Sequence, residues 1–313
     1  MKALISIIIP TYNRAHLIGE TIASIQKQTY THWECIIVDD GSTDTTESVL
    51  LAYINKDARI SYYKKPKHVP KGPSAARNYG FTKSKGIYIN WFDSDDLMHP
   101  EKLATDLKYL HSGNFDFTIS QSAFFKAQGE PKKKYWNKNL WSKDPINDFI
   151  IKKIGWSTNA PLWRRDRLEA CNLVFDEDLM TADDFKFHVQ AMQFGLKPVI
   201  IETSLVSQRE HDARLNDYPD KASNKIRTYL YLLKHREALQ LNAKTLKYLN
   251  WHFLKYYSSL LKAKRIKDAL IVLFKVIILP FKIKTKLKSL KLWILGVFYI
   301  LTGVGYKFLK TDS

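Results

Sequence analysis

The sequence predicts an α/β fold with a mainly parallel, twisted sheet flanked by helices. Two runs of apolar residues, Leu4–Pro10 and Trp33–Asp40, are typical of strands buried on both faces of a parallel sheet. Between them, His16–Gln28 carries Leu and Ile at helical spacing. Strands that alternate with helices in this way indicate a sheet with helices on both faces.

The remaining elements follow in the same rhythm. Expected next are a strand at Arg59–Lys65, a helix at Ser74–Lys83 and strands at Tyr88–Phe92 and Phe115–Phe124. Polar residues in the last of these strands favour a place near an edge of the sheet. We then expect a polar loop at Lys126–Asp144, a helix through Phe194 and a strand at Pro198–Arg209.

At 313 residues the chain has room for one large α/β domain and an appendage. We expect a catalytic domain over residues 1–220 and a basic helical tail over residues 221–313. The two cysteines, Cys35 and Cys171, provide no disulfide framework, and no signal-peptide cleavage pattern follows Met1. These features favour a reducing cytoplasm.

The positive charge is concentrated in the tail. The chain has a net charge of +18, and residues 221–313 hold 20 Lys and Arg against three acids. The tail therefore carries +17, and the rest of the chain is almost neutral. Such asymmetry indicates a polyanionic partner, either nucleic acid or an anionic membrane surface. Because the tail is too apolar for a solvated basic arm, we expect the membrane surface and no nucleic acid.

Apolar segments of the tail alternate with lysines. Ala269–Leu279 is almost wholly apolar, and Leu292–Tyr306 has no charge over 15 residues, short of the roughly 20 that span a bilayer. The pattern favours helices that lie in the interface of an anionic leaflet, peripheral on the inner face of the cell membrane. The alternatives are that these helices pack on the catalytic domain or form a dimer.

Acidic side chains follow two of the predicted strands. Asp39 and Asp40 end the second strand, and Asp93, Asp95 and Asp96 come directly after the fourth. Ligands of parallel sheets bind outside the carboxyl ends of the strands, so we expect these acids to build one site. Buried carboxylates require a cation, and Mg²⁺ and Mn²⁺ prefer oxygen ligands. The alternative is that Asp95 or Asp96 caps the next helix.

Four motifs carry a resemblance to a known family. They are Pro10-Thr11-Tyr12-Asn13-Arg14, Val38-Asp39-Asp40-Gly41-Ser42-Thr43-Asp44, Ala76-Arg77-Asn78-Tyr79-Gly80 and Asp93-Ser94-Asp95-Asp96. Their order and spacing resemble family 2 glycosyltransferases over residues 3–212. The resemblance implies a GT-A fold, a nucleotide-diphosphate-sugar donor with UDP favoured, Mn²⁺ or Mg²⁺, and inversion at the anomeric carbon. It also implies a glycan or lipid-linked acceptor in cell-envelope polysaccharide synthesis.

The resemblance places the donor beside Pro10, Thr11, Tyr12, Arg14, Asp39, Asp40, Arg77 and Asp93. Tyr12 is suited to stack on a nucleobase, and Asp39 or Asp40 to accept the imide N–H of uracil. The planar fork of Arg77 suits phosphate or base edges. A core tyrosine and a surface ion pair are the alternatives for Tyr12 and Arg77. In the family, the acids corresponding to Asp93 and Asp95 meet the ribose and the metal, and Asp96 would assist.

A second acidic pair, Asp183 and Asp184, precedes the predicted helix through Phe194. Helix capping is the simple interpretation. The resemblance instead places the general base at Asp184, because an inverting transfer needs one base to deprotonate the acceptor hydroxyl. The family usually has Glu at the position of Asp183, so the role of Asp183, on the acceptor side, stays open.

Three further residues are candidates for the site. Trp156 and Trp163 lie in a segment that resembles the acceptor side of the family, where they would stack on sugar faces; packing in the core or at its rim is the alternative. The resemblance brings His211 near the metal or the diphosphate, and a surface histidine is the alternative.

The sequence thus predicts an inverting, metal-dependent glycosyltransferase. A sugar-nucleotide pyrophosphorylase would share a similar sheet, but the turn at residues 11–14 lacks the glycines of such enzymes. A catalytically idle, membrane-docked module of the same fold is the other alternative, and the presence of Asp93, Asp95 and Asp184 argues against it.

Overall fold

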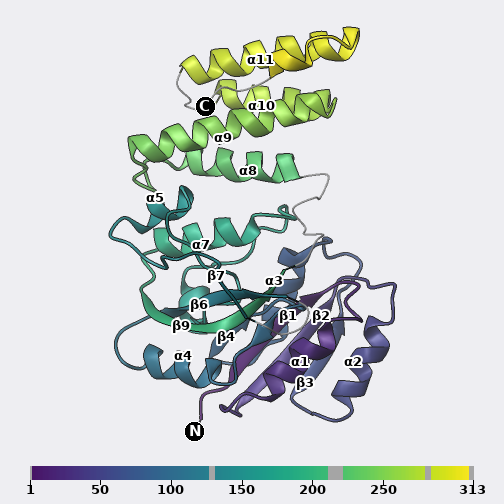
Figure 1. Ribbon diagram of the computed structural model, residues 1–313, viewed down its shortest axis with the longest axis vertical. Coiled ribbons are helices and arrows are strands. Elements are labelled where there is room, and N and C mark those ends of the chain that lie inside the picture. Colours follow the sequence, from purple (N-terminus) through teal and green to yellow (C-terminus); the bar gives the residue numbers. More distant parts are fainter. Residues whose placement is uncertain (1, 127–130, 211–220, 279–282, 310–313) are drawn as a thin grey trace. The chain divides into compact units, whose positions relative to one another are not determined.

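The computed structural model describes residues 2–126, 131–210, 221–278 and 283–309. The chain divides into two compact units, Met1–Asp212 and Ala213–Ser313, called here the N-terminal unit and the C-terminal unit (Figure 1). The N-terminal unit holds a mixed sheet with helices on both faces, and the described part of the C-terminal unit is helical. The predicted α/β architecture with a helical extension is confirmed.

The sheet of the N-terminal unit has nine strands within the described residues. Their order is β3-β2-β1-β4-β8-β6-β9-β5, with β7 paired to β6. The first four form the parallel half: β3 (Ile60–Lys64), β2 (Trp33–Asp39), β1 (Ile5–Thr11) and β4 (Tyr88–Trp91). Every residue of β1 is buried, as its apolar run predicts. Since β1 lies between β2 and β4, the ends of these three strands meet at one edge.

Helices cover both faces of this parallel half. They are α1 (Ile18–Gln26), α2 (Thr46–Ile54) and α3 (Pro73–Lys83). Ile5, Ile7 and Ile9 of β1 pack with α1 on one face. Val38 of β2 packs with Ala76 of α3 on the other. A Cβ atom added at Gly80 would lie 2.4 Å from Cγ2 of Ile8, so only glycine allows α3 to approach β1 this closely.

The second half of the sheet mixes parallel and antiparallel pairs. Its strands are β5 (Leu97–Met98), β6 (Phe117–Phe125), β7 (Pro131–Tyr135), β8 (Trp163–Arg164) and β9 (Pro198–Arg209). Its helices are α4 (Lys102–Leu110), α5 (Pro145–Ile150), α6 (Arg165–Ala170) and α7 (Asp183–Gln193). β7 lies in the segment expected to be a loop and pairs antiparallel with β6.

The position predicted for β6 near a sheet edge is wrong. β6 is bonded to β8 and to β9, and all of its residues are buried. The polar residues that suggested an edge have internal partners: Thr118 donates to Asp106, and Ser122 bonds Ser157. Buried hydroxyl groups are tolerated inside a sheet when they are hydrogen-bonded in this way.

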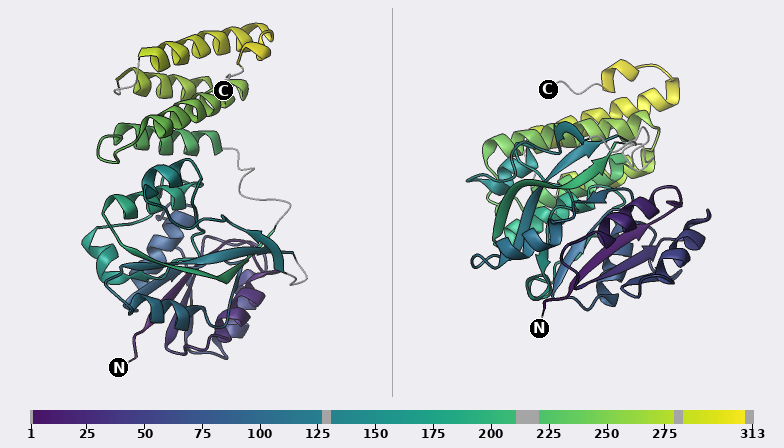
Figure 2. Two further views of the ribbon diagram at one scale, coloured as in Figure 1. Left: turned by 60° about the vertical axis from the view of Figure 1, so that its left-hand side comes forward. Right: turned by 60° about the horizontal axis from the view of Figure 1, so that its bottom comes forward.

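The C-terminal unit contains α8 (Lys221–Lys234), α9 (Ala243–Lys262), α10 (Ile266–Ile278), α11 (Ile283–Thr302) and the 3₁₀ helix η2 (Tyr306–Leu309). The side chain of Asn242 caps α9 by accepting from the amide of Thr245. α9 contacts α8, α10 and α11, as the views in Figures 1 and 2 also show. No helix within the described ranges combines the length and hydrophobicity that a membrane crossing requires.

Candidate active site

The loops that follow β1, β2 and β4 lie together. The amide of Asn13 donates to Oγ of Ser42 at 2.9 Å, and Oδ1 of Asn13 accepts from the amide of Thr43 at 2.8 Å. Nε of Arg14 lies 3.5 Å from Oδ2 of Asp95. The polar turns that sequence reasoning assigned to one site are therefore in direct contact.

Among the predicted donor residues after β1, Tyr12 and Arg14 are accessible. Tyr12 is half exposed, and the side chain of Arg14 is partly exposed beside Asp95. Pro10 and Thr11 belong to β1 and are buried. The exposed ring and the guanidinium are thus the groups of this turn that a ligand can reach.

The two acids after β2 hold backbone in place. Oδ1 of Asp39 accepts from the amides of Gly41 and Ser42, at 3.0 and 2.8 Å, and Oδ2 accepts from the hydroxyl of Tyr62 at 2.7 Å. Gly41 has a φ of 90°, a left-handed conformation that glycine adopts easily. Asp40 pairs with Lys65 and accepts from the amide of Gly72.

The three carboxylates of the acidic turn after β4 differ in exposure and in their partners. Asp93 pairs with Arg77 at 2.9 Å, and Asp95 is partly exposed beside Arg14. Asp96 is buried: Oδ1 accepts from the amide of Arg209 at 2.8 Å, and Oδ2 accepts from Nδ2 of Asn159 at 2.6 Å. Burial raises the pKa of Asp96, and the charges of Asp95 and Asp93 raise it further.

Arg77 of α3 is buried between two of the predicted site acids. Its Nη2 lies 2.9 Å from Asp93 and its Nη1 lies 2.8 Å from Asp183, which also accepts from Ser74. Although burial opposes the charged form, Asp183 and Asp93 raise the pKa of Arg77. Arg77 therefore joins Asp93 of the acidic turn to Asp183 at the start of α7.

Asp184 is less buried than Asp183. Ala182, just before α7, has a φ of 63°, and Asp183 and Asp184 form the first turn of the helix. The carboxylate of Asp184 accepts from the amide of Phe185 at 2.7 Å. Burial raises the pKa of Asp93, Arg77 lowers it, and the charges of Asp95 and Asp184 raise it. The charge of Asp184 therefore acts on the pKa of Asp93 in the acidic turn.

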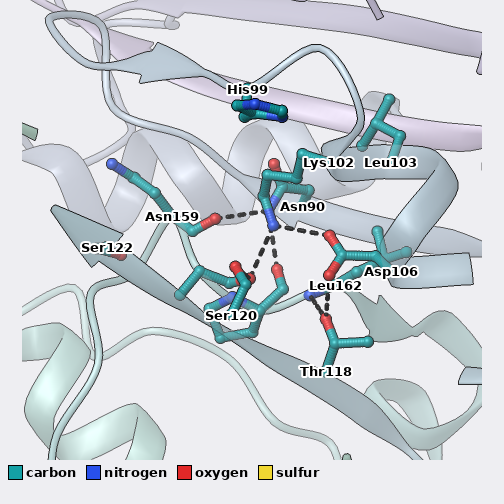
Figure 3. Close-up of polar contacts among 12 residues, drawn as sticks. Asn90, His99, Lys102, Leu103, Asp106, Thr118, Ser120, Ser122, Asn159 and Leu162 are labelled. Atoms are coloured by element: carbon teal, nitrogen blue, oxygen red, sulfur yellow. Dashed lines mark hydrogen bonds and ion pairs between the residues drawn. The ribbon is translucent and has the colours of Figure 1, made fainter. Parts of the chain in front are cut away.

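A polar network behind the acidic turn fixes its backbone. Oδ1 of Asn159 accepts from the amide of Asp93 at 2.9 Å, while its Nδ2 donates to Asp96. Nδ2 of Asn90 donates to the carbonyls of Asn159 and Pro161, at 3.1 and 2.8 Å. Asn159 thus clamps both ends of the turn. Asn90 in turn holds the segment that carries Asn159 (Figure 3).

Lys102 and Asp106 of α4 extend this network into the core. Nζ of Lys102 lies 2.7 Å from Asp106 and donates to the carbonyl of Ala160 at 2.8 Å, and both side chains are fully buried (Figure 3). Asp106 also accepts from Thr118 of β6 at 2.8 Å. Burial raises the pKa of Asp106, and the Lys102 charge opposes this. The pair therefore links α4, β6 and the segment of Asn159.

Trp156 and Trp163 lie in the core, which was the alternative interpretation of both. Trp163 is 1% exposed and stacks on Phe117 with ring centroids 4.1 Å apart. Trp156 is buried against Phe149 at 4.6 Å. Because neither ring presents a face to solvent, stacking of these side chains on a sugar does not fit the structure.

The residues available for a metal are acids of the turn after β4. Five carboxylates, those of Asp93, Asp95, Asp96, Asp183 and Asp184, share this region with the guanidinium groups of Arg14, Arg77 and Arg209. This excess of acid suits a divalent cation. In the part of the chain that the structure describes, no three His, Cys, Asp or Glu side chains are grouped to hold a metal by themselves. His211 lies outside the described residues.

Sequence reasoning missed Asn159, Lys102 and Arg209. Nε of Arg209 donates to the carbonyl of Asp95 at 3.0 Å, and its Nη2 pairs with Glu20. These residues come from different elements, and their contacts with the turn span 66 residues for Asn159 and 114 for Arg209. The one local signal in the sequence is at Asn159, which stands two residues before a proline in Asn159-Ala160-Pro161.

Comparison with solved structures confirms the fold. S. aureus TarS 1-349 in complex with UDP-GlcNAc matches 97% of this chain and 92% of its own, with a TM-score of 0.60 and 18% identity. The mannosyltransferase PcManGT from Pyrobaculum calidifontis, in complex with GDP-Man and Mn²⁺, matches 97% of this chain and 88% of its own, with a TM-score of 0.54 and 17% identity. The N-terminal unit therefore has the GT-A fold, as predicted.

Sequence comparison identifies the family. WfgD of Escherichia coli, a UDP-Glc:alpha-D-GlcNAc-diphosphoundecaprenol beta-1,3-glucosyltransferase, is 36% identical over 114 residues, which are 36% of this chain and 44% of WfgD. The chain spans about a fifth of the length of the first three curated relatives that it matches. Residues 6–167, about half of the chain, match the sequence model of Glycosyl transferase family 2. The chain belongs to glycosyl transferase family 2.

Proposed function

We propose that the N-terminal unit transfers a sugar from a UDP-sugar to a hydroxyl group of a glycan or lipid-linked acceptor in cell-envelope polysaccharide synthesis. The observation that carries this proposal is the contact among the loops after β1, β2 and β4, together with Arg77, which joins Asp93 of the last loop to Asp183 at the start of α7. The names of WfgD and of the TarS complex, which specify UDP-sugars, support the donor class.

The donor is placed over the ends of β1, β2 and β4. Tyr12, half exposed, stacks on the base, and Arg14 meets the diphosphate. Asp39 is buried with both oxygens accepting hydrogen bonds, so it shapes the loop that borders the base. Asp40, which is more exposed, is assigned the imide N–H of uracil. Asp93, fixed by Arg77, faces the ribose. Arg77 is thus assigned a positioning role toward the donor.

We place the divalent metal at Asp95. Asp95 is partly exposed, whereas both oxygens of Asp96 already accept hydrogen bonds, so Asp96 orients the turn beside the metal. Mn²⁺ and Mg²⁺ often bind one or two carboxylates together with phosphate oxygens of a substrate, which suits this arrangement. A metal bound there would neutralise charge on the leaving diphosphate. His211 remains a further predicted ligand.

Asp184 is the proposed general base. It lies in the first turn of α7 next to Asp183, which Arg77 joins to Asp93 of the acidic turn. It removes the proton of the acceptor hydroxyl as that oxygen attacks the anomeric carbon from the side opposite the leaving UDP. One base suffices for this inverting transfer, because no covalent intermediate forms. Asp183, paired with Arg77, holds the start of α7 in place.

The proposed location is the inner face of the cell membrane. WfgD takes an acceptor on a diphosphoundecaprenol lipid, and the C-terminal unit of this chain is strongly basic. Cys35 and Cys171 are both free, which fits a reducing compartment. An anionic membrane surface is therefore the proposed partner of the C-terminal unit.

Calorimetric titration of the purified chain with UDP, GDP, CDP and dTDP tests the donor and metal assignments together. We expect UDP to bind in the presence of Mn²⁺ and to lose affinity at least about tenfold with chelator, because the diphosphate shares the metal with Asp95. Asp95→Asn should show the weak affinity even with Mn²⁺. The matched control Asp166→Asn changes an exposed acid of α6 and should bind like wild type.

Two results would contradict these assignments. Tight binding of another nucleotide in preference to UDP would overturn the donor class. Binding of UDP by Asp95→Asn that keeps the full Mn²⁺ dependence would move the metal away from Asp95.

A further inference from the structure

Helix α11 is amphipathic, but its small and hydroxyl-bearing residues face the other helices and a row of its apolar residues is exposed. Its face toward the rest of the C-terminal unit is made of Thr285, Ser289, Leu292 and Gly296, all buried. The hydroxyl of Thr285 donates to Asn250 of α9 at 3.1 Å. Small and hydroxyl-bearing residues thus form most of the contact that a water-soluble helix normally makes with apolar side chains.

The opposite face of α11 is apolar and exposed. Its members follow one another at intervals of three or four residues, and each has at least 40% of its surface exposed: Ile283, Leu287, Leu290, Ile294, Phe298 and Leu301. This spacing places them on one stripe along the full length of the helix. Such a contiguous stripe is expected to be covered by a partner.

Helix α10 has an exposed apolar side of its own. Ile271, Phe274 and Ile278 recur at intervals of three and four residues and are exposed, while Val272 and Val276 pack inward. α10 and α11 contact one another within the C-terminal unit. We call the exposed apolar residues of α10 and α11 the apolar face.

The charges around the apolar face select its occupant. No acidic residue occurs between residues 269 and 309. Lys284, Lys288 and Lys291 are exposed on α11 beside the stripe, and Lys275 is exposed on α10. A second copy of this chain would bring like charges together, whereas an anionic lipid surface would attract them. Lysine stems can also lie along apolar surface with their charge in the headgroup region.

We propose that the apolar face docks on an anionic lipid bilayer, with α10 and α11 lying in the interface and their lysines among the lipid phosphates. This proposal deepens the membrane partner proposed above, because it assigns the contact to the exposed apolar residues of two neighbouring helices. The inward small residues let α11 pack close to α9, where a Cβ at Gly296 would lie 2.7 Å from Leu261. The exposed apolar stripe of α11 is then left for the lipid.

Vesicle flotation of the full chain tests the proposal. Vesicles of phosphatidylcholine alone are compared with vesicles that contain 30 mol% phosphatidylglycerol, an anionic lipid composition chosen for the assay. Wild type should float with the anionic vesicles. The double variant Ile294→Ser/Phe298→Ser should bind about tenfold more weakly or worse, because each substitution removes apolar area from the interface.

The N-terminal unit offers a matched control. Ile87 is 55% exposed, as is Ile294, and Phe194 is 51% exposed, against 50% for Phe298. Ile87→Ser/Phe194→Ser therefore removes the same side chains at equal exposure, and it should float like wild type. Circular dichroism and UDP binding verify that both double variants are folded.

A charge variant supplies a second measurement. Lys284→Gln/Lys288→Gln/Lys291→Gln should weaken binding to anionic vesicles by roughly fivefold per lysine. Failure of wild type to float, or equal flotation of the Ile294/Phe298 variant and wild type, would overturn the proposal. The proposal would also be overturned if light scattering showed that wild type is a dimer, that the Ile294→Ser/Phe298→Ser variant is a monomer, and wild type did not bind vesicles. A failed donor assignment would leave flotation unchanged, so the two proposals fail separately.

Discussion

Asp183 and Asp184 are adjacent in the sequence but have different surroundings. Asp183 is buried and holds Arg77 at 2.8 Å, whereas Asp184 is only partly buried. The pattern of two acids before a helix predicted capping or catalysis without separating the two residues. Their burial separates them. A group that reacts with an acceptor hydroxyl must be reachable. A buried guanidinium, in turn, needs a carboxylate such as that of Asp183 to accept its hydrogen bond.

This difference predicts opposite effects of two isosteric substitutions. Asp184→Asn should keep the free energy of unfolding within about 0.5 kcal/mol and lower the transfer rate by roughly 10²–10⁴-fold. Asp183→Asn should lower the free energy of unfolding by about 1.5–3 kcal/mol, because a charged hydrogen bond to Arg77 is lost. Urea unfolding and sugar transfer to an acceptor are measured for both variants.

The reverse result would exchange the roles. If Asp183→Asn were stable and inactive while Asp184→Asn kept its activity, the base would be Asp183 and Asp184 would serve the helix terminus. UDP binding should be retained by Asp184→Asn, and its loss there would contradict an action of Asp184 on the acceptor alone.

Sequence reasoning predicted those site residues that can be identified from their immediate neighbours in the chain. The acids at the ends of β2 and β4 followed from the strands that precede them. The polar clamp at Asn159 did not, because its partners Asp93 and Asp96 lie 66 and 63 residues away in the chain. Trp156 and Trp163 were ambiguous for the same reason: a tryptophan in a loop segment is buried or exposed according to what packs on it, and here Phe117 and Phe149 do.

At the scale of elements, the parallel half of the sheet was predictable and the second half less so. β1 and β2 are continuous apolar runs, and such runs fit only strands covered on both faces. β6 contains four consecutive polar or small positions near Ser120, and its interior place depends on partners in α4 and in the segment of Ala160. The position of β6 in the sheet depends on hydrogen bonds to other elements, and such bonds produce no periodic pattern in the sequence.

Helix α4 supplies a test of that network. Removing one partner of a buried ion pair leaves an uncompensated charge, so Lys102→Met should lower the free energy of unfolding by about 3–5 kcal/mol. Lys102→Met/Asp106→Leu replaces both charges by apolar groups and should be closer to wild type than the single variant. Unfolding in urea, followed by tryptophan fluorescence, gives the three values.

A surface pair provides the comparison. Lys153 and Asp148 also form an ion pair, at 2.9 Å, but Lys153 is largely exposed. Lys153→Met should therefore change the free energy of unfolding by less than about 1 kcal/mol. A loss in Lys102→Met no larger than that in Lys153→Met would show that the buried pair does not support α4 and β6.

At the scale of the whole molecule, the net positive charge and the candidate site lie in different parts of the chain. Residues 221–313 carry +17 of the net charge of +18, and the acids and arginines of the candidate site belong to the N-terminal unit. The sequence alone shows this asymmetry. It does not show that the apolar stripe of α11 faces away from the other helices, because Thr285, Ser289 and Gly296 take inward positions that a hydrophobic pattern would assign to leucines.

This separation predicts that two binding events of one chain respond differently to salt. Between about 0.1 and 1 M NaCl the Debye length falls from about 10 Å to about 3 Å. Binding to vesicles with phosphatidylglycerol should weaken by roughly 10-fold or more over this range, because exposed lysines such as Lys284 and Lys291 attract the surface through solvent. Binding of UDP with Mn²⁺ should change less, since close contacts with a metal and buried groups are screened weakly. Flotation and calorimetry in the same buffers measure both; equal salt slopes would mean that one basic surface serves both ligands.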